Sequence, residues 1–464
     1  MSPRSQSSAK HASASAALRP ERELQQIAAT VLRLAKARGV PETEVHLEET
    51  NQSLTRFANN SIHQHVAEHG LVVSIRTACD ARTARVTTNR VDEDALRAAI
   101  DDCLSLASHQ PKDAQLLPMP GKQKYRAVRH FHASTAALTA EDRARAVKAA
   151  CQFAEKRGQV AAGIFSSGQS QTVLGNSNGV SAAYRQTHAT FSVTMQQGSA
   201  ASWAKGNAGD VRQFDPLDLT KIASEKAARA ENPVELAPGK FTVILEPAAV
   251  LDLVGFLFYD FSATAVADMR SCFAKRVGKQ LLSRNVTITD DVYHPHQLGA
   301  PFDGEGMPRQ RVLLVDRGVV KNLVYSRRSA RQAHKQPTGH GFPLPNEYGE
   351  APMNLVVEGG KTSVEEMIAS TNRGLLVTRL WYIREVDPYE KIMTGMTRDG
   401  LFLVEKGKIA HAARNFRFNQ SVLEMLRNLD SLGPARRTTA EEAFEMVVPP
   451  MKVRDFHFSE VTKF

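Results

Sequence analysis

The second half of the chain is dominated by short β-type runs that are separated by turn residues. Runs rich in β-branched and large apolar residues follow one another from about residue 242 to residue 412. Two connections, Asp316-Arg317-Gly318 and Glu405-Lys406-Gly407, carry a glycine in a tight turn, and each predicts a hairpin. The chain beyond residue 230 is therefore expected to be mostly β-structure. The predicted strands are Thr242–Leu245, Val286–Thr289, Arg311–Val315, Val319–Tyr325, Asn354–Val357, Leu375–Leu380, Gly400–Glu405 and Lys408–Ala412.

Helical patterns are concentrated in the first half. Apolar residues at helical spacing predict a helix from Pro20 to Ala37 and another from about Asp92 to Ala107, with short β-type runs between them. A third helix begins at Thr139, which forms a capping box with Asp142. In the second half, helices are predicted from Ser363 to Gly374 and over about Gln420 to Leu429. After the third helix a β-meander is predicted, with strands Gly163–Ser167, Gln171–Leu174, Val180–Gln186 and Thr190–Gln196 and a turn at Asn176–Gly179.

The length of 464 residues exceeds what a single hydrophobic core serves, so two or three domains are expected. Residues 1–19 are rich in serine and alanine and predict a disordered tail. A change of composition around residues 231–240 marks the main boundary. The predicted division is a tail at 1–19, an α+β domain at 20–115, a central helix with a β-meander at 116–230, and a β-rich domain at 231–464.

Charge and cysteine usage limit the function classes. The formal charge is +10 and the pI is about 9.4, but the basic residues are spread along the chain among acidic ones, and aromatic residues make up only 6%. Nucleic-acid binding is therefore not expected as the main function. The four cysteines lie far apart without a C-x-x-C pair, which is typical of a reduced cytosolic protein. No apolar run is long enough to span a bilayer. These features predict a cytoplasmic protein without a membrane segment.

Several segments in order resemble the TldD/PmbA family, also called the modulator-of-DNA-gyrase family. Their order and spacing cover residues from about 45 to 430, which makes the resemblance specific at family level. The segments are 56–64 (RFANNSIHQ), 175–179 (GNSNG), 287–291 (TITDD), 301–306 (PFDGEG), 329–331 with 338–340 (SAR and TGH), 374–378 (GLLVT) and 400–405 (GLFLVE).

The resemblance implies an α+β fold, with an N-terminal α/β region followed by a C-terminal domain dominated by antiparallel β-structure. It also implies association between subunits, in which a TldD-type subunit carries zinc on an H-E-x-x-x-H helix and a TldE/PmbA-type subunit does not. This chain has no His-Glu dipeptide, and the two histidine positions fall approximately on Glu246 and Leu251. The distant cysteine ligand is missing too, because the last cysteine is Cys272. We therefore expect no catalytic residues, metal ligands or cofactor on this chain, and zinc only on a partner subunit.

The resemblance also directs attention to two loops as parts of a substrate channel. Asp303 and Glu305 stand between glycines that let a ligand approach the backbone, although a tight turn with solvated carboxylates explains them equally well. Asn59 and Asn60 could present their amides to a peptide or complete a turn. His340 lies in a Gly/Pro-rich loop. The pair His294 and His296, and His334 with His340, are weaker possibilities for metal binding.

These observations favour a non-zinc, TldE-like component of a system that degrades unfolded peptides. Its expected partners are a copy of itself or a zinc-bearing TldD-type homologue, together with unfolded peptide as substrate. Two alternatives stay open at this point: a stand-alone regulatory binding protein of the gyrase-modulator kind, and a hydrolase with an unrecognised site.

Overall fold

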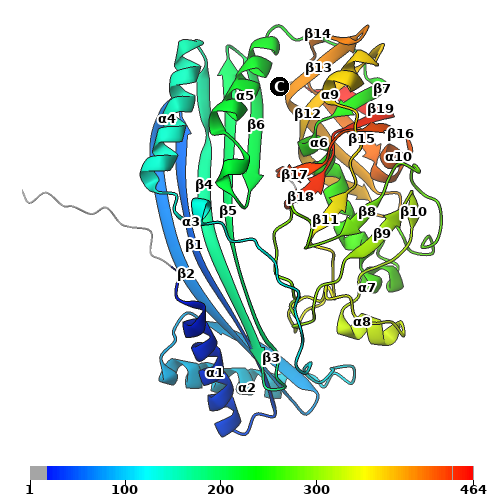
Figure 1. Cartoon of the computed structure of the whole chain (residues 1–464). Coiled ribbons are helices and arrows are strands. Elements are labelled where there is room, and N and C mark those ends of the chain that lie inside the picture. Colours follow the sequence, from blue (N-terminus) through cyan, green and yellow to red (C-terminus); the bar gives the residue numbers. More distant parts are fainter. Residues whose placement is uncertain (1–17, 442, 463–464) are drawn as a thin grey trace, which may run out of the picture.

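The computed structural model describes residues 18–441 and 443–462. It has the predicted α+β fold, with one large antiparallel sheet in the N-terminal half and two further sheets in the C-terminal half (Figure 1). None of the helices in these residues is long and apolar enough to cross a membrane.

One six-stranded antiparallel sheet, in the order β3-β2-β1-β4-β5-β6, forms the N-terminal half. The segments predicted as 20–115 and 116–230 share this sheet, because β1 pairs with β4 from Glu44↔Asn176 to Phe57↔Gly163. Four strands are far longer than predicted, since polar residues within them lie on a helix-free face and do not interrupt the ladder. The strands are β1 (Glu42–Ala58), β2 (Ser61–Cys79), β3 (Arg82–Thr88), β4 (Val160–Asn176), β5 (Ser181–Gln197) and β6 (Ala200–Ala208).

Helices cover one face of this sheet. Alternate residues of β1 are buried against them, as the period of a strand requires. At one end α1 and α2 enclose a core that includes Leu24, Val45 and Ile100. At the other end α4 and α5 enclose a core around Phe57 and Phe191. The helices are α1 (Glu21–Ala37), α2 (Glu93–His109), α3 (Ala133–Ala136), α4 (Ala140–Lys156) and α5 (Pro216–Arg229), with a 3-10 turn η1 (Val211–Gln213).

The capping box predicted at Thr139 and Asp142 is present at the start of α4. In contrast, α5 was not predicted. Its N-cap is Asp215, and Pro216 occupies the first turn, which together form a recognisable start signal.

The C-terminal half lies opposite the helix-free face of the large sheet (Figure 1). Five of its strands close on themselves in the order β12-β7-β19-β15-β13, because β13 pairs back onto β12. This closed ring encloses aliphatic and phenylalanine side chains, among them Phe416, Phe418 and Phe456. Its strands are β7 (Gly239–Leu245), β12 (Arg373–Asp387), β13 (Ile392–Glu405), β15 (Phe416–Ser421) and β19 (Met451–Val461), with β14 (Lys408–Ala412) and β16 (Leu429–Leu432) attached.

A second sheet, in the order β10-β9-β8-β11-β18-β17, packs beside the ring. As the resemblance implied, antiparallel pairs dominate, and the only parallel ones among the described residues are β7 with β12 and β11 with β18. The strands are β8 (Ile288–Asp290), β9 (Val312–Asp316), β10 (Val319–Val320), β11 (Leu355–Val357), β17 (Arg436–Thr438) and β18 (Met446–Val448).

The C-terminal half contains more helix than predicted. The helix predicted from Ser363 to Gly374 ends earlier, at Ala369, because β12 begins at Arg373. The helix predicted over 420–429 shortens to α10, since residues 416–421 pair as β15. The helices are α6 (Pro247–Val254), α7 (Ala263–Ala267), α8 (Arg327–Gln332), α9 (Val364–Ala369) and α10 (Val422–Arg427), with the 3-10 helix η2 (Gly255–Phe261).

Two irregular segments also differ from expectation or join the halves. Most of the predicted tail lies outside the described residues, but Arg19 is docked, since its guanidinium Nη1 lies 2.6 Å from the buried Glu49 carboxylate. Between α2 and α3, residues 119–132 form an extended segment, here called the strap. The strap contacts the C-terminal half, where the Tyr125 hydroxyl donates to the Gly306 carbonyl at 2.8 Å.

Candidate functional site

The two predicted loop carboxylates lie in a tight turn, but they are buried and not solvated as the turn interpretation assumed. Asp303 is 3% and Glu305 is 5% exposed. The Asp303 carboxylate accepts the backbone N–H groups of Glu305, Met307 and Gly341 at 2.7–2.9 Å. Three such donors stabilise a charged carboxylate inside the protein. The turn was therefore predicted correctly, whereas the solvent exposure of its side chains was wrong.

Glu305 has a different environment although it is two residues away. Its Oε2 accepts the backbone N–H of Arg327 at 2.8 Å. A methyl group at Gly341 would lie 2.3 Å from the same oxygen, so the glycine is what allows this loop to approach the carboxyl group. Burial, and then the charge of Asp303, raise the pKa of Glu305 to about 8. At neutral pH Glu305 therefore carries a proton and can donate a hydrogen bond.

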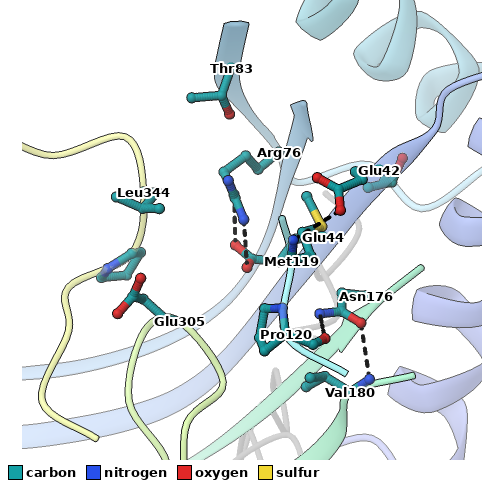
Figure 2. A network of polar contacts seen from close by, with 12 residues as sticks. Glu42, Glu44, Arg76, Thr83, Met119, Pro120, Asn176, Val180, Glu305 and Leu344 are labelled. Carbon is teal, nitrogen blue, oxygen red and sulfur yellow. Dashed lines mark hydrogen bonds and ion pairs between the residues drawn. The ribbon is translucent and has the colours of Figure 1, made fainter. Parts of the chain in front are cut away.

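A second buried charge cluster comes from the N-terminal sheet. Glu44 on β1 accepts hydrogen bonds from Arg76 on β2 at 3.2 and 3.3 Å and from Arg85 on β3 at 2.5 Å (Figure 2). Burial alone would raise the pKa of Glu44, but Arg76 and other neighbouring charges, including Arg85, outweigh it and lower the pKa. A carboxylate shared by two guanidinium groups is charged and held in place from both sides.

The two clusters meet where the halves of the protein join. The Arg85 Nε donates to the Leu344 carbonyl at 2.6 Å, and Leu344 belongs to the same stretch of chain as Gly341. Figure 2 shows Glu305 and Leu344 on loops that face Arg76 and Glu44. The Glu44 charge also contributes to the raised pKa of Glu305. We call Glu44, Arg76, Arg85 and Glu305 the junction site.

His340 lies beside the junction site, but its ring is occupied in the structure of the loop. Its Nε2 and the Oδ1 of Asp290 are 2.9 Å apart, and its Nδ1 and the Thr338 hydroxyl are also 2.9 Å apart. The side chains of His340 and Asp290 are fully buried. This pair fastens the loop to the end of β8 and thereby holds Gly341 against Glu305.

Asn59 and Asn60 lie far from these residues. Both have positive φ, of 50° and 58°, and they form the turn between β1 and β2, which confirms the turn interpretation. The Asn60 amide also donates to the Gln159 carbonyl and accepts the Ala161 N–H. Strand β1 separates this turn from Glu44 by about 45 Å, at roughly 3.3 Å per residue. The structure therefore brings together Asp303, Glu305 and His340, and places the two asparagines elsewhere.

Sequence reasoning missed the N-terminal residues of the junction site. Glu44, Arg76 and Arg85 are single charged residues within β-type runs, where a solvated position is the ordinary expectation. They become neighbours only through the register Glu44↔Arg76 and Arg76↔Arg85. No local signal in the sequence marks that register.

The segment expected to match the zinc helix of TldD-type subunits is α6, a core helix. All eight of its residues are buried, and Leu251 is completely inaccessible. Glu246 caps the helix and accepts two hydrogen bonds from Lys226 Nζ at 2.6 and 2.7 Å. An ammonium group thus lies at the position where the resemblance placed the first zinc histidine.

The weaker histidine candidates do not assemble into a metal site. The rings of His294 and His296 are 5.6 Å apart in a surface loop, and His334 is exposed while His340 is buried. Between residues 18 and 441 and between 443 and 462, no three His, Cys, Asp or Glu side chains are arranged to hold a metal ion.

Comparison with known proteins identifies the family. The model of the PmbA/TldA metallopeptidase C-terminal domain matches residues 238–460, and the model of the central domain of the same proteins matches residues 133–231. The chain belongs to the PmbA/TldD family. Metalloprotease PmbA of Escherichia coli O157:H7 is 25% identical over 322 residues, which are 67% of this chain and 68% of that protein. A protein of Methanocaldococcus jannaschii is 29% identical over 213 residues, which are 44% of this chain and only 50% of that relative.

Solved structures share the fold of this family member. TldE from Thermococcus kodakarensis superposes with a TM-score of 0.86 at 20% identity, over 93% of this chain and all of that one. A Thermotoga maritima protein, assigned as a candidate modulator of a DNA gyrase, superposes with a TM-score of 0.83 at 21% identity, over 94% of this chain and all of that one. At these identities the likeness concerns the fold alone.

Proposed function

We propose that this chain is the non-zinc, TldE-like subunit of a metallopeptidase of the PmbA/TldD family. In that role it binds unfolded peptide together with a zinc-bearing TldD-type partner, which supplies the metal and the hydrolytic chemistry. The observation that carries the proposal is α6. The helix is filled with buried aliphatic residues, and Lys226 binds the Glu246 carboxylate at its start. A cation already bound there is incompatible with a zinc ion at the same place.

The junction site supports a role in positioning rather than in hydrolysis. Glu44 is neutralised by two arginines, and Glu305 is protonated near neutral pH. Neither carboxyl group is free to activate a water molecule as the general base of a zinc peptidase does. Both groups instead hold the N-terminal sheet against the loops of the C-terminal half.

The test combines metal analysis with peptidase assays on the purified full-length chain. We expect no stoichiometric zinc and no cleavage of an unfolded peptide by the chain alone. Mixed with a TldD-type relative that contains H-E-x-x-x-H, it should form a complex that cleaves the peptide faster than the relative alone. The matched control is the same relative with its motif histidines changed to alanine, which should bind this chain but cleave nothing. About one tightly held zinc per chain, with chelator-sensitive cleavage by the chain alone, would refute the proposal.

A further inference from the structure

Strand β5 has an open edge over its first half. Strand β6 pairs only with residues 189–197 of β5, so residues 181–188 have no strand on that side. The strap runs beside this edge, but one backbone hydrogen bond joins the two, from the Thr187 N–H to the His130 carbonyl at 3.0 Å. The open edge and the strap therefore form the two walls of a slot.

Backbone groups inside the slot are unpaired. Backbone N–H and C=O groups of alternate residues point to the same side of a strand. Because the Thr187 N–H points toward the strap, those of Ala183 and Arg185 point into the slot as well. Neither finds a backbone acceptor in the part of the chain that the structure describes. A sheet edge with free backbone groups of this kind is where an extended peptide can add as a strand.

The walls of the slot are strongly basic. The strap contains Lys122, Lys124, Arg126 and Arg129 and no acidic residue, and Arg185 faces it from β5. Arg126 stacks on Tyr293 and Arg185 on Phe131, with the guanidinium carbons 4.4 and 4.3 Å from the ring centroids. None of these five cations has a carboxylate within ion-pairing distance among residues 18–441 and 443–462. Unpaired cations around a concave site attract anionic ligands.

The space between the walls is large enough for a ligand. A pocket of about 460 Å³ is bounded by residues 125–131 of the strap, by residues 183–185 of β5 and by Pro301. Sites for small ligands and short peptide segments have volumes of roughly 300–1,000 Å³.

From this combination we propose that the slot between the strap and the open edge of β5 binds an extended acidic peptide segment. The peptide backbone pairs with the free groups of Ala183 and Arg185, and its carboxylates contact Arg126, Arg129 and Arg185. A single-stranded nucleic acid fits the same charge but not the aromatic residues. Tyr125 is packed against Phe302 with its hydroxyl bonded, so its ring is not free to stack on a base. The slot lies away from α6, and its ligand is bound by this chain without a partner subunit.

Fluorescence anisotropy with labelled hexaglutamate and the full-length chain tests the proposal. Hexaglutamate should bind, and hexalysine and a hexamer of thymidylate should bind at least about tenfold more weakly. Arg129→Gln should weaken hexaglutamate binding about threefold, the size expected for one partly exposed charge pair. Changing Arg126, Arg129 and Arg185 together to glutamine should weaken it more than about tenfold. The matched control, Arg229→Gln at the exposed end of α5, removes the same charge and should leave binding unchanged.

A second probe separates strand addition from general attraction by a basic protein. Hexaglutamate that is N-methylated at alternate residues keeps its charge but loses backbone donors, and it should bind about tenfold more weakly or worse. Equal binding of the methylated peptide, tighter binding of thymidylate, or equal losses in Arg129→Gln and Arg229→Gln would each overturn the proposal. The side chain of Arg129 makes no polar contact within the described residues, so its substitution leaves folding intact. Circular dichroism of each variant checks this.

Discussion

Replacing Glu305 by glutamine should change how the stability of the protein depends on pH. The pKa of Glu305 is raised from its usual 4.5 to about 8 in the folded chain. The folded state therefore keeps a proton that the unfolded state loses above pH 4.5. The resulting stability is fully present below pH 4.5 and is lost as the pH rises toward 8. With these two values, the wild type loses about 2 kcal/mol of unfolding free energy between pH 5 and pH 7 through this group alone.

Glutamine is the closest neutral substitute for the protonated side chain, and its carbonyl can still accept the Arg327 N–H. The Glu305→Gln variant should therefore lack this loss, so its stability relative to wild type should rise by about 2 kcal/mol between pH 5 and pH 7. Urea unfolding at pH 5, 6, 7 and 8 measures the difference, which cancels the contributions of other titrating groups. The control is Glu347→Gln, at an exposed glutamate of the neighbouring loop. If the curves of wild type and Glu305→Gln run parallel across this range, the assignment of a raised pKa to Glu305 is wrong.

Three further outcomes follow from contacts in the N-terminal half and at the junction. Glu44→Gln should cost about 3–5 kcal/mol in urea unfolding because it leaves buried guanidinium groups without their counter-charge, whereas the exposed Glu48→Gln should be nearly neutral. Gly341→Ala should destabilise by about 1–3 kcal/mol, since its methyl group would lie 2.3 Å from a carboxylate oxygen, and a thermal midpoint equal to wild type would contradict this. Deleting residues 1–17 should leave the thermal midpoint unchanged, because their composition offers almost nothing to bury. A deletion that also removes Arg19 should lower it, because a buried carboxylate loses its cation.

Local signals in the sequence predicted a large share of the elements. The capping boxes at Thr139 and Ser363 place the starts of α4 and α9, and the turn at Asn176–Gly179 joins β4 to β5 as expected. These features depend on a few neighbouring residues, so they can be recognised without knowledge of the fold. The lengths of β1 and β2 were underestimated. Their polar residues are compatible with a strand only because one face of the large sheet has no helices on it.

The sequence by itself determined the family, the α+β fold and the absence of the zinc motif, because each of these is written in residue identities and their order. It also singled out the turn that contains Asp303 and Glu305. Only the tertiary structure decided that these carboxyl groups are buried and that Glu305 faces Glu44, some 260 residues earlier in the chain. Strand register brings Arg76 and Arg85 to Glu44, and the docking of the two halves brings that cluster to Glu305. The protonation of Glu305 follows from that burial and from neighbouring charges, which depend on distances in space that residue order does not encode.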